Sequence, residues 1–153
     1  MNIKKILIIS LCVFAIILSL NVASAGFFDG LFGSDQPTNV TISGINFTIP
    51  AGYDEDTSMS KVNEMADDGQ IMNSKSYTNG EFVIGISVSS YGGDGIYWNG
   101  DELFNTTQKT IAGKEGYISH DSELDSDFFM YVDGDKGIIV SAHNETIIED
   151  IIS

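Results

Sequence analysis

The chain has 153 residues, with 22 acidic side chains against 7 basic ones and a formal net charge of −15 at pH 7. Affinity for nucleic acid is built from lysine and arginine contacts to phosphates, so we exclude nucleic acid as a partner. The single cysteine, Cys12, lies in the N-terminal apolar stretch. The rest of the chain therefore has no disulfide, no catalytic thiolate and no cysteine metal ligand.

The N-terminus has the order of a secretory signal. Lys4 and Lys5 precede an apolar run from Ile6 to Leu20, and Ala23-Ser24-Ala25 supplies small residues for cleavage. We predict a signal peptide over residues 1–25. The alternative is an uncleaved anchor, because about 20 apolar residues span a bilayer. Either way the remainder is exported, to the extracellular space or the cell envelope, and its charge is 5 − 22 = −17.

Residues 26–38 form a linker rich in glycine and aromatic residues. Two interpretations stay open for its apolar side chains: they pack against the following domain, or they dip into the outer membrane surface. Contact with a membrane is expected only through this N-terminal part of the chain, if the signal stays uncleaved. The apolar residues in question share one side of a short helix and are Phe27, Phe28, Leu31 and Phe32.

The first half of the domain begins with alternation. Apolar residues alternate with threonine and asparagine from Val40 to Ile49, which predicts a half-buried strand or a tight hairpin about Ser43-Gly44. The acidic stretch from Asp54 to Asp68 fits either a short helix or a solvated loop. Asn79-Gly80 then predicts a type I′ hairpin turn between residues 70–78 and 81–90.

The second arm of that hairpin predicts one core face and one solvated face. Phe82, Ile84, Ile86 and Val88 alternate with Val83, Gly85, Ser87 and Ser89. A glycine-rich loop from Tyr91 to Gly100 and a short helix near Asp101 follow. Further strands are predicted over residues 106–111, 116–120, 128–132 and 137–142, with a turn at 133–136.

Asn144 is expected to cap a closing helix with one apolar stripe, formed by Ile147, Ile148, Ile151 and Ile152. Strands joined by hairpins with such a helix predict an α+β fold. We expect a mainly antiparallel sheet built from hairpins, with the C-terminal helix packed on one face. Residues 39–153 are expected to form a single domain.

Two stretches resemble known families. The opening Asn39 to Tyr53, NVTISGINFTIPAGY, resembles a group of small, uncharacterised exported proteins of methanogenic archaea, which implies an envelope location. The second half, with KTIAGKEGY at Lys109 to Tyr117 and the closing NETIIEDII, is similar in order to the tail of PsbP-like and anti-sigma-associated domains. That resemblance implies a helix behind an antiparallel sheet.

Four Asn-x-Thr sequons suit an exported glycoprotein, although strand-rich sequences are also rich in threonine. They begin at Asn39, Asn46, Asn105 and Asn144. Asn105 is the favoured acceptor because it falls in a predicted loop, and Asn144 is disfavoured because it should cap the last helix.

Four acidic residues alternate with serine and leucine, as oxygen ligands of a hard cation could. They are Asp121, Glu123, Asp125 and Asp127. The stretch fails the EF-hand pattern, with Ser126 where glycine is needed and Val132 where glutamate is needed. A solvated acidic loop is the favoured interpretation, and weak calcium binding is the alternative. No other cofactor is expected.

Tyr91, Tyr97 and Trp98, with Asp94 beside them, could receive a sugar ring or a peptide on the glycine-rich loop. The favoured alternative is that Trp98 packs into the core. His120 and His143 belong to no catalytic motif, and His120 and Asp121 should point to opposite faces of a strand. We read both histidines as strand-end residues and expect no enzyme.

The leading hypothesis is therefore an exported, acidic, non-catalytic domain of the cell surface or envelope, membrane-associated only if its signal stays uncleaved. Its duty would be structural or the binding of an envelope component whose identity the sequence leaves open. The first alternative is a sugar- or peptide-binding module that uses the loop from Tyr91 to Gly100. The second is a weak divalent-cation-binding domain.

Overall fold

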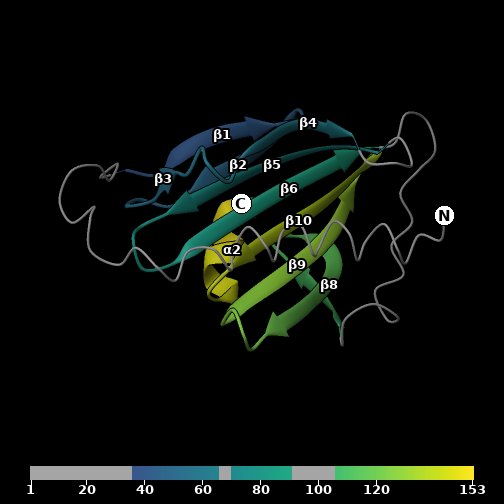
Figure 1. Cartoon of the computed structure of the whole chain (residues 1–153). Helices are drawn as coiled ribbons and strands as arrows, with labels where there is room; N and C mark the ends of the chain where they lie inside the picture. Colours follow the sequence, from purple (N-terminus) through teal and green to yellow (C-terminus); the bar gives the residue numbers. More distant parts are fainter. Residues whose placement is uncertain (1–35, 66–69, 91–105) are drawn as a thin grey trace.

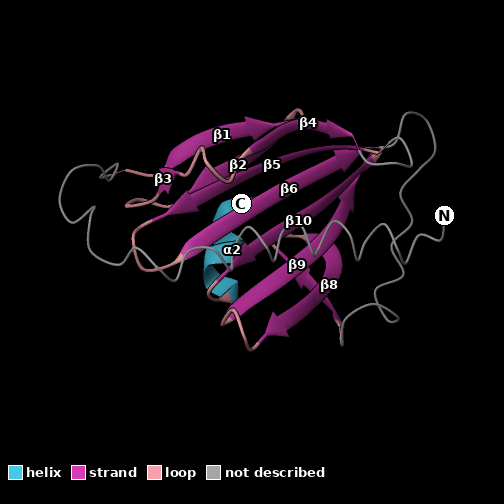
Figure 2. Cartoon of the chain, viewed as in Figure 1, coloured by secondary structure: helices cyan, strands magenta, loops and turns pink. Residues whose placement is uncertain are grey.

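A computed structural model of the chain describes residues 36–65, 70–90 and 106–153. The expected signal peptide, most of the linker, and the loop from Tyr91 to Gly100 lie outside the described residues, as does the helix expected near Asp101. The described part consists of ten strands and one helix (Figures 1 and 2). In chain order these are β1 (Thr38–Ile42), β2 (Ile45–Ile49), β3 (Asp54–Glu55), β4 (Lys61–Met65), β5 (Ile71–Thr78), β6 (Val83–Ser90), β7 (Thr107–Ile111), β8 (Lys114–Asp121), β9 (Ser126–Asp133), β10 (Lys136–Ala142) and α2 (Glu145–Ile152).

The strands form two antiparallel sheets. β1 and β2 make a two-stranded hairpin, and the other eight strands make a sheet in the order β3-β5-β6-β10-β9-β8-β7, with β4 also paired to β5. The centre of the large sheet is the pairing of β6 with β10 (Figure 1). α2 packs against β10 and β2. The expectation of a mainly antiparallel sheet with a C-terminal helix packed against it is confirmed.

The main core lies between the large sheet, α2 and the β1–β2 hairpin. Ile84, Ile86 and Val88 of β6 are fully buried there, as the alternation predicted, and Ile148 and Ile151 of α2 are fully buried opposite. Burial of each such side chain contributes about 1.5–3 kcal/mol. The hairpin adds its own inward-facing residues, Ile42, Phe47 and Ile49.

Gly116 of β8 is needed for the packing of this core. A Cβ at this position would lie 2.3 Å from the carbonyl oxygen of Met130 and 2.9 Å from two ring carbons of Phe129. Both distances are shorter than any real Cβ contact. The absent side chain of Gly116 therefore lets the fully buried ring of Phe129 lie directly against the backbone of β8.

The expected helix or loop at 54–68 is wrong where the structure describes it. The residues form β3, a turn and β4, and both strands pair with β5. In the turn, the Asp56 carboxylate accepts hydrogen bonds from the backbone N–H and the hydroxyl of Ser58, at 3.0 and 2.6 Å. An isolated helix this short is marginal in water, whereas the edge of β5 gives this stretch a strand to pair with. Residues 66–68 lie outside the described part.

The hairpin at Asn79-Gly80 is confirmed, but its expected type I′ turn is wrong. Thr78 pairs with Val83 across a four-residue connection, and only Gly80 within it has a positive φ. The Asn79 side chain instead accepts hydrogen bonds from the backbone N–H groups of Glu81 and Phe82, at 3.0 and 2.8 Å. These bonds hold a wider loop in place of the two-residue turn.

Turns with two successive positive φ values occur elsewhere. Ser43-Gly44 joins β1 to β2 with φ of 51° and 82°, which confirms the hairpin alternative for residues 40–49. Ala112-Gly113 joins β7 to β8 in the same way, with 47° and 75°. The expected strands in the second half are confirmed, and Gly134-Asp135 makes the turn between β9 and β10.

The second face of the large sheet departs from the prediction. Ser87 and Ser89 of β6 were expected to face solvent, yet both are buried, as are Ser74 and Ser76 of β5. A second apolar cluster lies on the same face farther across the sheet. Its members are Phe128, Met130 and Ile139, with Tyr117 and Leu124 packed against them.

The closing helix begins as predicted. Asn144 has an extended backbone, and its side-chain oxygen accepts a hydrogen bond from the backbone N–H of Ile147 at 3.1 Å. Glu145 adds a negative charge to the first turn, where the helix dipole favours it. Within residues 36–65, 70–90 and 106–153, no helix combines the length and the apolar character that crossing a membrane requires.

Candidate functional site

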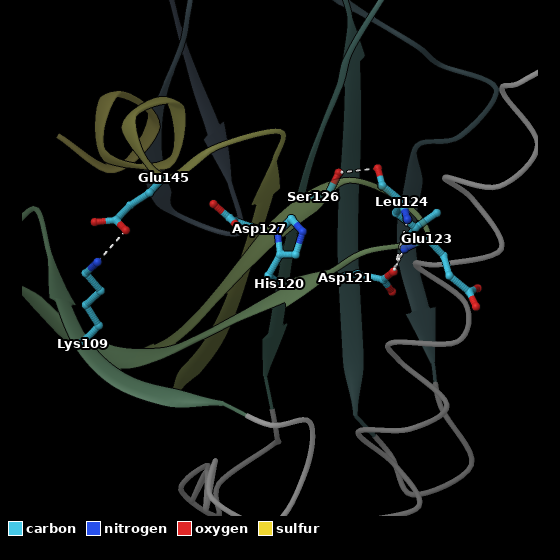
Figure 3. Close-up of polar contacts among 8 residues, drawn as sticks. All are labelled: Lys109, His120, Asp121, Glu123, Leu124, Ser126, Asp127 and Glu145. Atoms are coloured by element: carbon cyan, nitrogen blue, oxygen red, sulfur yellow. Dashed lines mark hydrogen bonds and ion pairs between the residues drawn. The ribbon is translucent and has the colours of Figure 1, made fainter.

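The four expected cation ligands lie in and beside the turn between β8 and β9. Figure 3 shows three of them, Asp121, Glu123 and Asp127. Asp121 directs its carboxylate into the turn and accepts hydrogen bonds from the backbone N–H groups of Glu123 and Leu124, at 2.8 and 3.1 Å. Asp127 faces His120 instead, 2.8 Å from its Nδ1. Glu123 and Asp125 are exposed.

These four carboxylates are therefore not brought together. Two of them already bind protein groups, and they point to different partners. In the described part of the chain, no group of three or more histidine, cysteine, aspartate or glutamate side chains is arranged to hold a metal ion. The carboxylate of Asp121 orders the turn by holding the N–H groups that follow it, as aspartate commonly does in turns.

His120 and Asp127 form a cross-strand pair that the sequence analysis missed. The four-residue turn places Asp121 opposite Ser126, so His120 falls opposite Asp127 on the next row. Counting back from the turn would have found this pair, since directly opposed residues share a face. The pair becomes an ion pair when His120 is protonated. His120 and Asp121 have different hydrogen-bond partners, as expected for adjacent residues of a strand.

His143 lies just after β10, against the ring of Phe82. The two rings are stacked, with centroids 4.0 Å apart and planes inclined by 17°. Within the described residues, the Nδ1 atom of His143 is buried without a hydrogen-bond partner, and neither histidine is hydrogen-bonded to a hydroxyl group. Both histidines lie at strand ends, as expected.

Strand β4 is the most exposed apolar part of the described chain. Val62 and Met65 keep 73% and 70% of their surface in contact with solvent, and Ile71, which pairs with Met65 on β5, is also exposed. We call Val62, Met65 and Ile71 the β4 patch. β4 pairs only with β5 among the described strands, so its other side is an open sheet edge.

Glu64 sits within the same strand and, as the neighbour of Met65, points to the other face from Met65. Its Oε2 atom is shielded from solvent and accepts no hydrogen bond from any described residue. A buried carboxylate oxygen without a hydrogen-bond donor is costly. β4 also departs from regular pairing, because Asn63 has a φ of 52° and the register shifts between Lys61 and Glu64.

The buried serine face holds a second set of polar atoms. Ser76 of β5 and Ser141 of β10 both pair with Gly85 of β6, so they flank a residue that has no side chain. The hydroxyls of Ser76 and Ser141 are buried and have no hydrogen-bond partner among the described residues. One row away, the hydroxyls of Ser74 and Ser87 lie 3.2 Å apart and bond to each other.

Three tyrosines of the core have raised pKa values. Burial raises the pKa of Tyr77 and of Tyr131 well above the usual 10, and the nearby charges of Glu55 and Asp133 add to the effect. Burial, with a smaller contribution from Glu81, also raises the pKa of Tyr53. The hydroxyl of Tyr77 has no hydrogen-bond partner in the described chain. All three side chains are therefore neutral at physiological pH.

Few charges on the protein can offset its acidity. Ion pairs join Lys75 to Glu55 and Lys114 to Asp133, each at 2.7 Å. A third joins Lys109 of β7 to Glu145 of α2 (Figure 3). These pairs are partly exposed and each contributes about 0–1 kcal/mol. Among the described acidic residues, Glu55, Asp133 and Glu145 are the ones paired with a lysine. After residue 25 the chain has five lysines against 22 acidic residues.

The proposed ligand residues Tyr91, Asp94, Tyr97 and Trp98 lie outside the described residues, as does the sequon at Asn105. The other three sequons are described: Asn39 and Asn46 lie on the exposed side of the β1–β2 hairpin, and Asn144 caps α2. Neither the β4 patch nor the buried serines was predicted from the sequence. No known protein family, curated protein or solved structure matches the chain.

Proposed function

We propose that this chain is an exported, non-catalytic domain of the cell surface or envelope, and that it binds another envelope component through β4. The order of charge, apolar run and small residues at its N-terminus supports export. Its charge of −17 after residue 25 keeps the domain soluble and favours a partner with basic groups, because complementary charge speeds encounter.

The observation that carries the binding role is the β4 patch on an open sheet edge. Single exposed apolar residues are common on protein surfaces, but Val62, Met65 and Ile71 are neighbours on two paired strands. An edge strand offers unpaired backbone groups to a second chain, and exposed apolar side chains make that pairing favourable. β4 therefore has the properties of a strand-addition site.

The chemistry of β4 also constrains its partner. Strand addition requires an extended segment, and Val62 and Met65 require apolar side chains on one face of that segment. The acidity of the domain favours basic side chains elsewhere on that segment, because complementary charge speeds encounter. We propose an extended segment of an envelope protein with alternating apolar and basic residues.

Binding to isolated envelopes tests this role. The exported protein with Val62→Ser and Met65→Ser should bind at least about a hundredfold more weakly, since the two changes remove roughly 1.5–3 kcal/mol of apolar burial each. Val132→Ser on β9 is the matched control, because Val132 is the other exposed large apolar residue of the described chain, at 39%. Equal binding by the double variant and the control would contradict the use of β4.

Export is tested on the full chain carrying a C-terminal tag. Protease added to intact cells should degrade the tag, and N-terminal sequencing should find Gly26 first if the signal is cleaved, or Met1 if it is kept as an anchor. Tagged protein that stays protected inside intact cells would contradict the location. A catalytic turnover that His120→Asn or His143→Asn abolishes would contradict the non-catalytic role.

A further inference from the structure

The outer side of the β1–β2 hairpin brings two sequons together. Asn39 begins the first sequon and Thr41 ends it, while Asn46 begins the second and Thr48 ends it. In the hairpin register, Asn39 lies opposite Thr48 and Thr41 lies opposite Asn46. These four side chains point away from the core, because the residues that alternate with them along the two strands, including Ile42, Phe47 and Ile49, are buried on the other side.

Each sequon holds the asparagine of the other. The Thr41 hydroxyl donates a hydrogen bond to Asn46 Oδ1 at 2.8 Å, and the Thr48 hydroxyl donates one to Asn39 Oδ1 at 3.3 Å. Both bonds engage the amide oxygens. Both asparagines are exposed, and the Nδ2 atom of each has no hydrogen-bond partner among the described residues. The atom that N-glycosylation modifies is therefore free at both positions.

The third described sequon differs in structure. The Asn144 side chain caps α2 through its bond to the backbone N–H of Ile147, and the residue is half-buried. Thr146 of that sequon already lies in the helix. A glycan is bulky and needs a solvent-facing site, so Asn144 is a poorer acceptor than Asn39 or Asn46.

We propose that Asn39 and Asn46 carry N-linked glycans and that the outer side of the β1–β2 hairpin is the glycan-bearing face of the protein. The inference rests on the export proposed above, which gives the chain access to a lipid-phosphate-linked glycan. Asn Nδ2 attacks the anomeric carbon of that donor. A C–N bond forms, the C–O bond to phosphate breaks, the lipid phosphate leaves with the bonding electrons, and the amide proton passes to the released phosphate.

The surroundings of the two sites suit this modification. Neither β1 nor β2 contains a charged residue, in a chain that carries 22 acidic ones. The two asparagines are diagonal neighbours across the hairpin, and residues in this relation lie about 7–8 Å apart. Two bulky glycans at that distance crowd one another, so we expect a mixture of singly and doubly modified protein.

The test is intact mass and glycopeptide mapping of the full chain, expressed in a secreting host that attaches N-linked glycans. Peptides covering residues 38–49 should carry one or two glycans. Thr41→Val should remove only the glycan on Asn39, and Thr48→Val only the one on Asn46. Thr41→Ser and Thr48→Ser are the matched controls, because serine keeps both the sequon and a hydroxyl, and both glycans should remain.

Asn39→Gln and Asn46→Gln repeat the test without touching the threonines, and melting curves verify that each variant folds. Exported protein with unmodified residues 38–49, or with a glycan on Asn144 alone, would overturn the glycosylation proposal and leave export standing. Unmodified protein retained inside the cells would overturn both proposals together.

Discussion

The two faces of the large sheet are both buried but are built from different side chains. On the face that meets α2 and the hairpin, isoleucine, valine and aromatic side chains interlock in one cluster. On the opposite face, serine and glycine occupy β5 and β6, and a smaller apolar cluster occupies β8 to β10. The comparison separates burial from stabilisation: the first face gains free energy from apolar contact, whereas the second also buries the hydroxyls of Ser76 and Ser141, which have no hydrogen-bond partner among the described residues.

Phe128 and Phe129 give the sharpest test of this difference, because they are consecutive residues on opposite faces. Phe129→Ala should lower the free energy of unfolding by about 3–5 kcal/mol, the usual cost of emptying a large core site. Phe128→Ala should cost less, since its cluster is smaller. Urea unfolding of the two variants measures both values. An equal or larger loss for Phe128→Ala would show that the serine-side cluster is as important as the main core.

Gly116→Ala should be the next largest effect. The added methyl group would collide with the Met130 carbonyl and the Phe129 ring, and overpacking of this kind costs about 1–3 kcal/mol. Gly80→Ala is a control for the presence of a methyl group, because nothing lies within 4 Å of a Cβ there, although its positive φ adds some strain. Thermal melting compares the two. A Gly116→Ala protein as stable as wild type would contradict the close packing of Phe129 on β8.

Alkaline unfolding probes the tyrosines of the main core. Above about pH 10 the unfolded chain releases tyrosine protons that the folded protein keeps, so the free energy of unfolding falls as pH rises. Tyr77 and Tyr131 should each contribute a slope of about −1.4 kcal/mol per pH unit. Urea unfolding between pH 9 and 11.5 measures this slope. Tyr77→Phe should remove one group's share, and an unchanged slope would contradict the assignment.

The smallest effects distinguish serines on the second face. Ser141→Ala removes a buried hydroxyl that has no hydrogen-bond partner among the described residues, so it should leave stability unchanged or raise it by up to about 1 kcal/mol. Ser87→Ala breaks the bond to Ser74 and leaves that hydroxyl unpaired, which should cost about 0.5–1.5 kcal/mol. Chemical unfolding of the two variants measures whether each change raises or lowers the free energy of unfolding. A clear loss in Ser141→Ala would mean that its hydroxyl does have a partner.

Most of the sheet could be predicted because its signals are local. Alternation along Ile84, Ile86 and Val88, turn residues such as Gly134, and the cap at Asn144 each act within a few residues. The helix expected after Asp54 failed because β5 supplied a strand partner, which is a long-range effect. The prediction that the serine side of β6 faces solvent was wrong. Period-two alternation identifies the two faces of a strand but does not indicate whether the polar face is covered by other residues.

The candidate sites also depend on long-range pairing, which local sequence signals do not reveal. The pairing of His120 with Asp127, and of each sequon with the other, depends on which residues lie opposite across a turn. The register of two paired strands depends on the length of the turn that joins them. The sequence alone did not fix these turn lengths, so no register was predicted. The exposure of Val62 and Met65 depends on β4 being an edge strand, which only the strand order of the whole sheet reveals.

The position of β10 has a consequence for the order of folding during synthesis. β10 is the last strand in the chain, yet it lies at the centre of the sheet, between β6 and β9. The ribosome therefore completes β1 to β6 before the strand that joins them to the second half exists. Until residues 136–142 emerge, β6 has no partner on that side, and the pairing then closes a long loop, which slows folding. The complete sheet can therefore form only after residue 142 has been synthesised.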